Sequence, residues 1–298
     1  MALDLKKLDG IGWQENGQAV LSGMALAMLR RLDRLFLLWA GECGAEEYRF
    51  PTFIEAGQLH KLDYFRSFPH LVTFPVALDT SPEHLKEFSR SAVIDEAGVV
   101  QLGKCAPVRE VLTPAACYHF YVLFQGTELK TARNLTTVAT CFRREAYYRP
   151  LERQWNFTMR EIVRIGAAEE VKDFLADYRA RIERFLSDIG LPVAWENATD
   201  PFFDPSRNPK FLAQKLEPVK TEMVFGGALA IGSINFHRNF FGETFDMRRN
   251  GEAAFSGCVA FGVERWLYAF LSRFGPDERS WPSVLRSHGI AGDLANDK

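Results

Sequence analysis

Residues 139–166 read ATCFRREAYYRPLERQWNFTMREIVRIG. Two apolar runs flank a charged centre, which predicts a β-hairpin with one strand ending at Glu145, a loop over 146–155 and a second strand from Asn156. Alternation along the strands places five side chains of mixed character on one face: Arg143, Glu145, Phe157, Met159 and Glu161. Charged groups on a shared sheet face are costly unless a ligand or metal satisfies them, so the hairpin predicts a site.

The character of these side chains indicates a nucleotide. The Arg143 guanidinium can bind a phosphate through two hydrogen bonds. Glu145 can accept a hydrogen bond from an adenine amine, and Phe157 offers a flat surface for the base. The alternative is a surface hairpin with ordinary salt bridges, because Arg-x-Glu alone is a weak pattern.

A segment near the C-terminus favours the nucleotide. Residues 256–266 read SGCVAFGVERW and predict a strand that turns at Gly262 into a helix. Glycine lets a base or ribose approach the backbone. Arg265, at the start of that helix, can meet a terminal phosphate.

Apolar periodicity predicts two longer helices, at residues 20–42 and 168–190. Gly190 ends the second helix. With strand-like runs between them, the chain is expected to have an α+β fold, with helices packed on a largely antiparallel sheet. Residues 46–54 predict an extended segment, and Pro51 within it favours an edge or end position over the middle of a sheet.

Three motifs resemble those of class II aminoacyl-tRNA synthetases, in the same order. RFPTFI with Pro51 is similar to motif 1, FRRE followed by RQWNF to motif 2, and FGVER to motif 3. The resemblance implies a class II catalytic core, a homodimer built through motif 1, and five ATP-binding residues, of which the first and last are also catalytic: Arg143, Glu145, Arg153, Phe157 and Arg265.

The chain also resembles archaeal-type seryl-tRNA synthetases and their truncated relatives, the amino acid:[carrier protein] ligases. PAACYHFY, MREI and SGCVAFG supply Cys117, Glu161 and Cys258, which are similar to the zinc ligands of that group. Three ligands leave the fourth position of a catalytic zinc open, and the resemblance implies that the substrate's α-amino group occupies it. Cys105 and Cys141 are the competing candidates.

The sequence also indicates roles for several other residues near these motifs. Asp200, in ENATDPFF (196–203), resembles the residue that pairs with the amino group in the carrier-protein ligases, although an Asp before Pro is also typical of a turn. His119 and His237 show no ligand spacing and are expected to be structural. The family's acidic residue before Ser233 is replaced by Ala and Leu, so magnesium is expected without assigned ligands; Glu222 is the nearest carboxylate.

The acceptor of the activated amino acid is expected to be a phosphopantetheine thiol on a carrier protein. The sequence shows no heptad arm for gripping tRNA before Pro51 and no anticodon-binding appendage after Arg265. Its formal charge of −2 offers no global attraction to nucleic acid. Arg179, Arg181 and Arg184 form a possible carrier-docking face, although neighbouring acids make a solvated, salt-bridged helix the alternative.

The predicted activity is therefore an ATP-dependent ligase that adenylates a small amino acid, glycine or alanine, and transfers it to the carrier thiol. The alternatives are a minimal seryl-type tRNA synthetase and a non-catalytic amino-acid-binding paralogue. With 298 residues, 47% of them hydrophobic, the chain can form a single catalytic domain over 1–298. Its most apolar early segment is interrupted by charges, so we expect a cytoplasmic protein without a membrane span.

Overall fold

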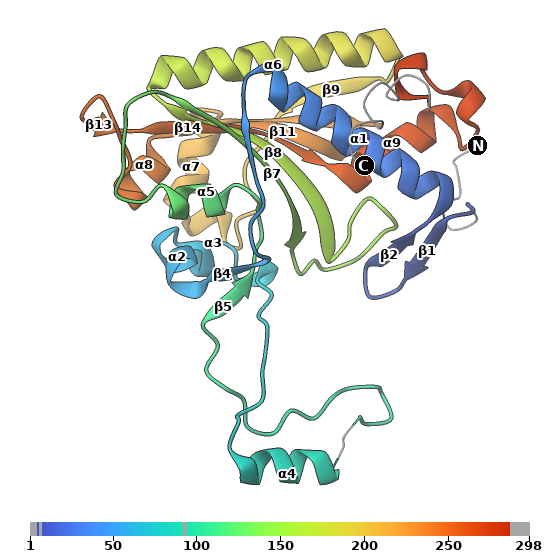
Figure 1. The fold of residues 1–298 in the computed structure, drawn as a ribbon, viewed down its shortest axis with the longest axis vertical. Helices are drawn as coiled ribbons and strands as arrows, with labels where there is room; N and C mark the ends of the chain where they lie inside the picture. Colours follow the sequence, from blue (N-terminus) through green and yellow to red (C-terminus); the bar gives the residue numbers. More distant parts are fainter. Residues whose placement is uncertain (1–4, 6–7, 92–93, 287–298) are drawn as a thin grey trace, which may run out of the picture.

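A twisted, mostly antiparallel sheet organises the computed structural model, which describes residues 5, 8–91 and 94–286 (Figure 1). Its seven strands follow the order β3 (Glu46–Tyr48), β7 (Arg133–Phe142), β8 (Asn156–Gly166), β14 (Phe255–Gly262), β11 (Leu229–Arg238), β10 (Lys220–Phe225) and β9 (Val193–Asn197). Only the edge pair of β3 and β7 is parallel. The predicted α+β class with an antiparallel sheet is confirmed.

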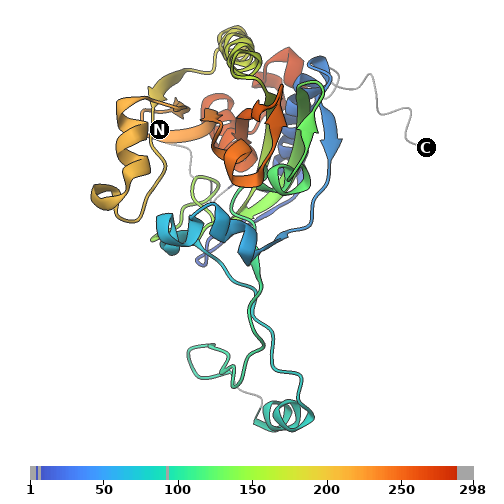
Figure 2. The same cartoon turned by 90° about the vertical axis from the view of Figure 1, so that its left-hand side faces the viewer.

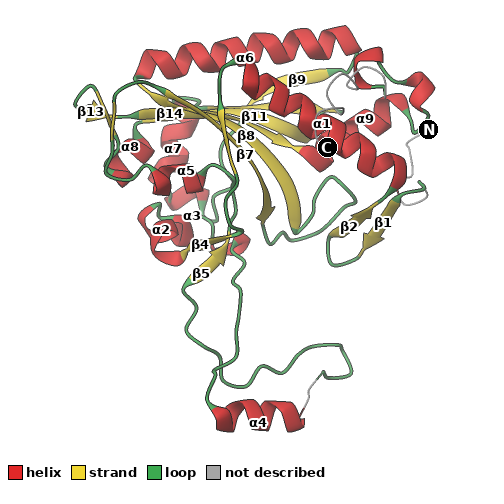
Figure 3. Ribbon diagram, in the orientation of Figure 1, coloured by secondary structure: helices red, strands yellow, loops and turns green. Residues whose placement is uncertain are grey.

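Three helices cover one face of this sheet: α1 (Gly23–Glu42), α6 (Ala168–Ile189) and α9 (Val263–Phe274) (Figures 1 and 3). Their apolar stripes form the larger core with alternate residues of the strands, such as Ile162, Val259 and Phe261. The helices expected at 20–42 and 168–190 are therefore confirmed. Gly190 ends α6 in the left-handed conformation, with φ 68°.

Short helices and loops line the opposite face: α2 (Ala56–Lys61), α3 (Tyr64–Ser67), α5 (Tyr118–Leu123), α7 (Pro209–Leu216) and α8 (Phe240–Phe245). Because side chains alternate along each strand, Glu161 and Cys258 point to this face while their neighbours Ile162 and Val259 point to the other. The sheet thus separates a helical core from the layer that holds the site.

The motif 2 hairpin differs in one detail from the prediction. Strand β7 ends at Phe142 rather than Glu145. The Arg143 backbone N–H still bonds the Trp155 carbonyl, but that of Arg144 bonds the Leu71 carbonyl, so the chain leaves the ladder there. The second strand begins at Asn156, as expected.

Two smaller hairpins flank the main sheet. Strands β1 (Ile11–Gln14) and β2 (Gln18–Leu21) lie beside the motif 2 loop, where the Trp155 backbone N–H bonds the Gly17 carbonyl. Strands β4 (Phe53–Glu55) and β5 (Glu110–Leu112) pair with each other, and Pro51 lies between β3 and β4. A three-stranded sheet of two-residue strands comprises β6 (Glu128–Leu129), β12 (Arg248–Arg249) and β13 (Glu252–Ala253).

An arm extends from β4 and β5, away from the rest of the molecule in both views (Figures 1 and 2). It comprises residues 74–109 and carries α4 (Pro82–Ser91) at its end. None of the side chains described in this arm is buried. Several large apolar side chains are exposed there: Phe74, Val76, Leu85, Ile94, Val99, Val100, Leu102 and Val108. No helix in the described part of the chain is long and apolar enough to cross a membrane.

Candidate active site

A cavity of about 410 Å³ opens on the face of the sheet opposite α1, α6 and α9. Its walls come from β8, β10, β11 and β14, and from the loops before α5 and α7. Every residue assigned to ATP, amino-group or zinc binding from the sequence lines this cavity except Arg153, which lies against it by pairing with Glu145. The fold therefore brings the predicted site residues together.

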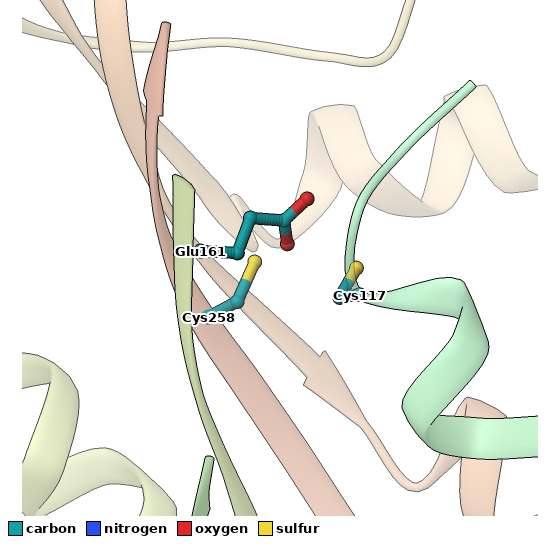
Figure 4. A group of neighbouring side chains, drawn as sticks. All are labelled: Cys117, Glu161 and Cys258. Carbon is teal, nitrogen blue, oxygen red and sulfur yellow. The ribbon is translucent and has the colours of Figure 1, made fainter. Parts of the chain in front are cut away.

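Three of the lining residues form a buried cluster at one end of the cavity (Figure 4). Ligand atoms of Cys117, Glu161 and Cys258 all lie within 4.8 Å of one another. Glu161 and Cys258 project from the adjacent strands β8 and β14, while Cys117 stands at the N-terminal end of α5. Cys105 is exposed on the arm, and Cys141 is buried outside this cluster, so the competing cysteines are excluded.

The surroundings of Glu161 indicate a missing partner. One carboxylate oxygen accepts from the Ala116 backbone N–H at 3.1 Å, whereas Oε2 is buried without a hydrogen-bond partner. Burial raises the pKa of the Cys117 thiol well above its usual range, and the adjacent Cys258 and Glu161 add to the rise. Two thiols and an orphaned carboxylate oxygen are a donor set that fits zinc, whose two positive charges would offset most of the negative charge of the ionised ligands.

The same cavity is lined by two arginines, Arg143 and Arg265, for which the described residues provide no ion pair. Arg143 donates from Nε to the Pro114 carbonyl at 2.9 Å, and its guanidinium lies 5.3 Å from the centre of the Phe157 ring. Arg265 donates to the carbonyls of Glu152 and Ala230. Burial, together with repulsion from nearby arginines, lowers the pKa of Arg265 to about 10. Such an arrangement favours an anionic ligand.

Glu145 already has a partner in the motif 2 loop. Arg153 Nη1 lies 2.6 Å from its Oε2. Arg153 is also placed over the Tyr147 ring, at 4.8 Å. An adenine amine at Glu145 would have to share this carboxylate with Arg153. The pair joins the two sides of the loop beside the cavity.

Asp200 lines the cavity from the loop before α7. Its carboxylate accepts from Lys220 Nζ at 3.3 Å and from Gln214 Nε2 at 2.9 Å. Burial would raise the pKa of Asp200, but the Lys220 ammonium and the Gln214 amide outweigh it and lower the pKa. Asp200 is therefore held ionised and available to a cationic group.

Glu222 lies directly across from Ser233 in the pairing of β10 and β11. Both side chains line the cavity, so the pairing of these strands brings the carboxylate considered from the sequence next to Ser233. Lys220 Nζ lies 3.0 Å from Glu222, as well as near Asp200. Lys220 thus balances two acidic groups, which sequence patterns did not reveal.

Two further lining residues were not predicted as part of the site. His237, expected to be structural, lies with Nε2 3.6 Å from Cys258 Sγ. Asn235 donates from Nδ2 to the same sulfur at 3.3 Å. Their spacing of two on a strand adjacent to Cys258 was the signal available in the sequence. His119 is buried as expected, stacked on Phe50 at 5.1 Å.

Comparison with known proteins identifies the family. The tRNA synthetase class II core domain (G, H, P, S and T) matches residues 108–274. Amino acid–[acyl-carrier-protein] ligase 1 of Bradyrhizobium diazoefficiens is 34% identical over 253 residues, which cover 82% of this chain and 76% of the relative. The chain belongs to the class II synthetase core family. Within it, the chain is a homologue of the amino acid–[acyl-carrier-protein] ligases.

More distant members of the class II core family share the fold. The type-2 serine–tRNA ligase of Methanococcus aeolicus is 25% identical over 96% of this chain, which spans only 58% of that protein. The M. kandleri SerRS, solved in complex with A. aeolicus tRNASec, superposes with a TM-score of 0.78 over 92% of this chain, at 22% identity. These similarities confirm the class II catalytic core expected from the three motifs.

Proposed function

We propose that this chain is an amino acid–[acyl-carrier-protein] ligase, which activates an amino acid with ATP and transfers it to a carrier-protein thiol. The observation that carries the proposal is the content of one cavity, which holds a buried Cys-Glu-Cys set together with two arginines that form no ion pair among the described residues. This matches a substrate with an amine at one end and ATP phosphates at the other. The homology to carrier-protein ligases supports the acceptor.

Activation is the first step of the proposed reaction. The amino acid carboxylate attacks the α-phosphorus of ATP, and the bond to pyrophosphate breaks. Arg143 is placed to stabilise charge on the α-phosphoryl oxygens and Arg265 to hold the γ-phosphate. Phe157 provides the surface for adenine, while Glu145, oriented by Arg153, accepts from the adenine amine.

The amino acid is held beside the Cys-Glu-Cys cluster. Cys117, Glu161 and Cys258 would hold zinc, which supplies a Lewis acid for a neutral α-amino group. Asp200, kept ionised by Lys220, is placed to accept from that amine. We propose a small substrate, glycine or alanine, since the rings of Tyr118 and Phe241 line the cavity. Magnesium would accompany ATP, with Glu222 as its candidate protein ligand.

Transfer is the second step. The thiol sulfur of a phosphopantetheine group attacks the acyl carbon, AMP leaves, and the thiol proton passes to the departing phosphate or to water. No protein nucleophile is needed. A tRNA hydroxyl is the less favoured acceptor, because the chain has a formal net charge of −2.

The structure argues against the sequence-based docking face on α6. This helix packs on the face of the sheet opposite the cavity. Arg179 is ion-paired with Glu183 at 2.9 Å, and Arg181 is ion-paired with Glu42. A carrier docked there would lie on the wrong side of the sheet for its thiol to reach the adenylate.

We propose that residues 1–298 act as one catalytic domain within a homodimer. The exposed apolar side chains of the arm, including Ile94 at 69% exposure and Val99 at 53%, support a second copy as the surface that covers them. Light scattering on the purified chain tests the dimer; a single-chain mass at assay concentration would overturn it.

Amino-acid-dependent ATP–pyrophosphate exchange on the zinc-loaded chain tests the function, with transfer measured to a phosphopantetheinylated carrier and to total tRNA. We expect exchange with a small amino acid and a thioester on the carrier. Loading of tRNA alone would identify a minimal seryl-type synthetase. Zinc binding without exchange for any amino acid would identify a non-catalytic amino-acid-binding paralogue.

A further inference from the structure

The two cysteines of the Cys-Glu-Cys cluster have unlike surroundings. Two side chains of β11 direct nitrogen atoms toward Cys258 Sγ: Asn235 Nδ2 at 3.3 Å and His237 Nε2 at 3.6 Å. Within the described residues, the hydrogen bonds include none to Cys117 Sγ from a side-chain nitrogen. The cluster is therefore supported by N–H donors on the Cys258 side.

The His237 ring is fixed by partners on three elements. Its Nδ1 lies 3.1 Å from the Tyr121 hydroxyl on α5 and 3.1 Å from the Ser256 hydroxyl on β14. Phe241 of α8 meets the ring edge to face, with centroids 5.0 Å apart. Both Tyr121 and Ser256 are fully buried. The ring consequently has little freedom to turn away from the sulfur.

These contacts also favour one tautomer of the imidazole. Two hydroxyl groups converge on Nδ1, and each can donate to it. When Nδ1 accepts, the proton resides on Nε2 and points at Cys258.

His237 is not itself placed as a ligand. Among the described residues, the ligand atoms that lie within 4.8 Å of one another are those of Cys117, Glu161 and Cys258, and no His237 nitrogen belongs to that group. A fourth coordination position at the cluster thus stays free for substrate.

We propose that His237 is a positioning residue, which donates its Nε2–H to the Cys258 thiolate and, with Asn235, holds it for the zinc ion. The inference rests on the zinc site of the proposed function. Two thiolates and a carboxylate carry three negative charges against two on zinc, so the buried complex has one excess negative charge. N–H donors at the sulfur offset that charge, which stabilises the complex.

The test compares His237→Phe, which keeps an aromatic ring without a donor, with His237→Gln, which keeps an N–H donor. His119→Phe is the control, because this buried histidine stacks on Phe50 outside the cavity. Each full-length variant is stripped of metal, then titrated with zinc chloride against a chromophoric chelator and with cobalt chloride for absorption spectra. Thermal unfolding verifies that each variant is folded.

We expect His237→Phe to weaken zinc binding by about 10–100-fold and to shift the sulfur-to-cobalt charge-transfer band to lower energy, because an unbonded thiolate is a stronger donor. His237→Gln should restore both measurements toward wild type, and His119→Phe should leave them unchanged. Affinity and spectrum in His237→Phe that equal those of wild type would overturn the inference.

X-ray absorption of the zinc-loaded protein separates the remaining outcomes. Loss of an imidazole nitrogen ligand in His237→Phe would make His237 a ligand and overturn its positioning role. Wild-type protein that binds neither metal would overturn the zinc site of the proposed function itself. In that case exchange activity without metal would show that activation proceeds without the cluster.

Discussion

Two buried arginine environments face each other across the sheet. On the helical side, Arg160 of β8 donates to Asp33 at 3.1 Å and to Glu47 at 3.1 Å. On the cavity side, Arg143 and Arg265 donate to backbone carbonyls among the described residues. Burial opposes the charge in both places, yet the carboxylates raise the pKa of Arg160, whereas desolvation and neighbouring arginines lower that of Arg265.

This difference distinguishes an arginine that stabilises the fold from arginines that are available to a ligand. A buried cation whose partners come from its own chain stabilises the fold, because its charge is offset before any ligand arrives. A buried cation without such a partner destabilises the fold, and a bound anion offsets this cost. The arginines were equivalent in sequence, since Arg143 and Arg160 belong to the same hairpin; only their faces of the sheet distinguish them.

The largest expected effect is on catalysis. Arg143→Gln or Arg265→Gln should reduce pyrophosphate exchange by about 10²–10³-fold, because each removes a donor to the phosphates. Arg265→Gln should also be as stable as wild type or up to about 1 kcal/mol more stable, since a buried charge whose pKa is lowered is gone. Exchange kinetics and denaturant unfolding measure the two effects; strong destabilisation with normal exchange would reverse the assignment.

Arg160→Met should instead reduce stability and leave catalysis nearly unchanged. We expect a loss of about 3 kcal/mol in the free energy of unfolding, because Asp33 and Glu47 lose their shared cation. Pyrophosphate exchange per folded molecule should change little, since Arg160 faces away from the cavity. Urea unfolding monitored by circular dichroism, with assays well below the transition, provides the measurement. An unchanged midpoint would remove the contrast between the two faces.

Glu47→Gln should have a smaller effect than Arg160→Met. The Glu47 side chain is 47% exposed, so water screens its pairing with Arg160. We expect a loss of about 0.5–1 kcal/mol at moderate salt, and a smaller loss at high salt. Unfolding at two salt concentrations measures both values. A loss as large as that of Arg160→Met would mean that Glu47, rather than Asp33, is the main partner.

Glu170→Gln should have the smallest effect on the free energy of unfolding, and only at pH values where Glu170 is ionised. The Arg249 guanidinium and the Ala167 backbone N–H lower the pKa of Glu170 at the start of α6. The resulting stabilisation, about 1 kcal/mol, is present above the unfolded-state pKa of about 4.3 and is lost as pH falls through the folded-state pKa. Wild type and variant should therefore differ at neutral pH and converge in acid. A constant difference would contradict the ionic origin.

The sequence allowed the helical side of the molecule to be predicted more fully than the site. Apolar periodicity identified α1 and α6 because each buries a continuous stripe. The cluster at Cys117 joins distant segments, and only resemblance to a family connected them. The pairing of Arg153 with Glu145 across a loop, and the approach of His237 to Cys258, depend on tertiary geometry that no periodic pattern encodes.

The arm was not anticipated either, for a different physical reason. Residues 74–109 alternate short apolar and charged stretches without a stripe that faces a core of their own. Their backbone is nevertheless ordered by contacts within the arm, such as the Lys104 N–H to His84 Nε2 at 3.0 Å. Local hydrogen bonding therefore contributes to its shape without a buried apolar core among its described residues.

The origin of the Cys-Glu-Cys cluster has a consequence for assembly. Glu161 and Cys258 are brought together by strand pairing, whereas Cys117 stands outside the sheet, at the N-terminal end of α5. A metal ion bound by all three would link the sheet to the layer that contains α5. Chelation should then leave the sheet protected from hydrogen exchange while the amides around Cys117 exchange faster. Metal supply would govern when the pocket closes during folding.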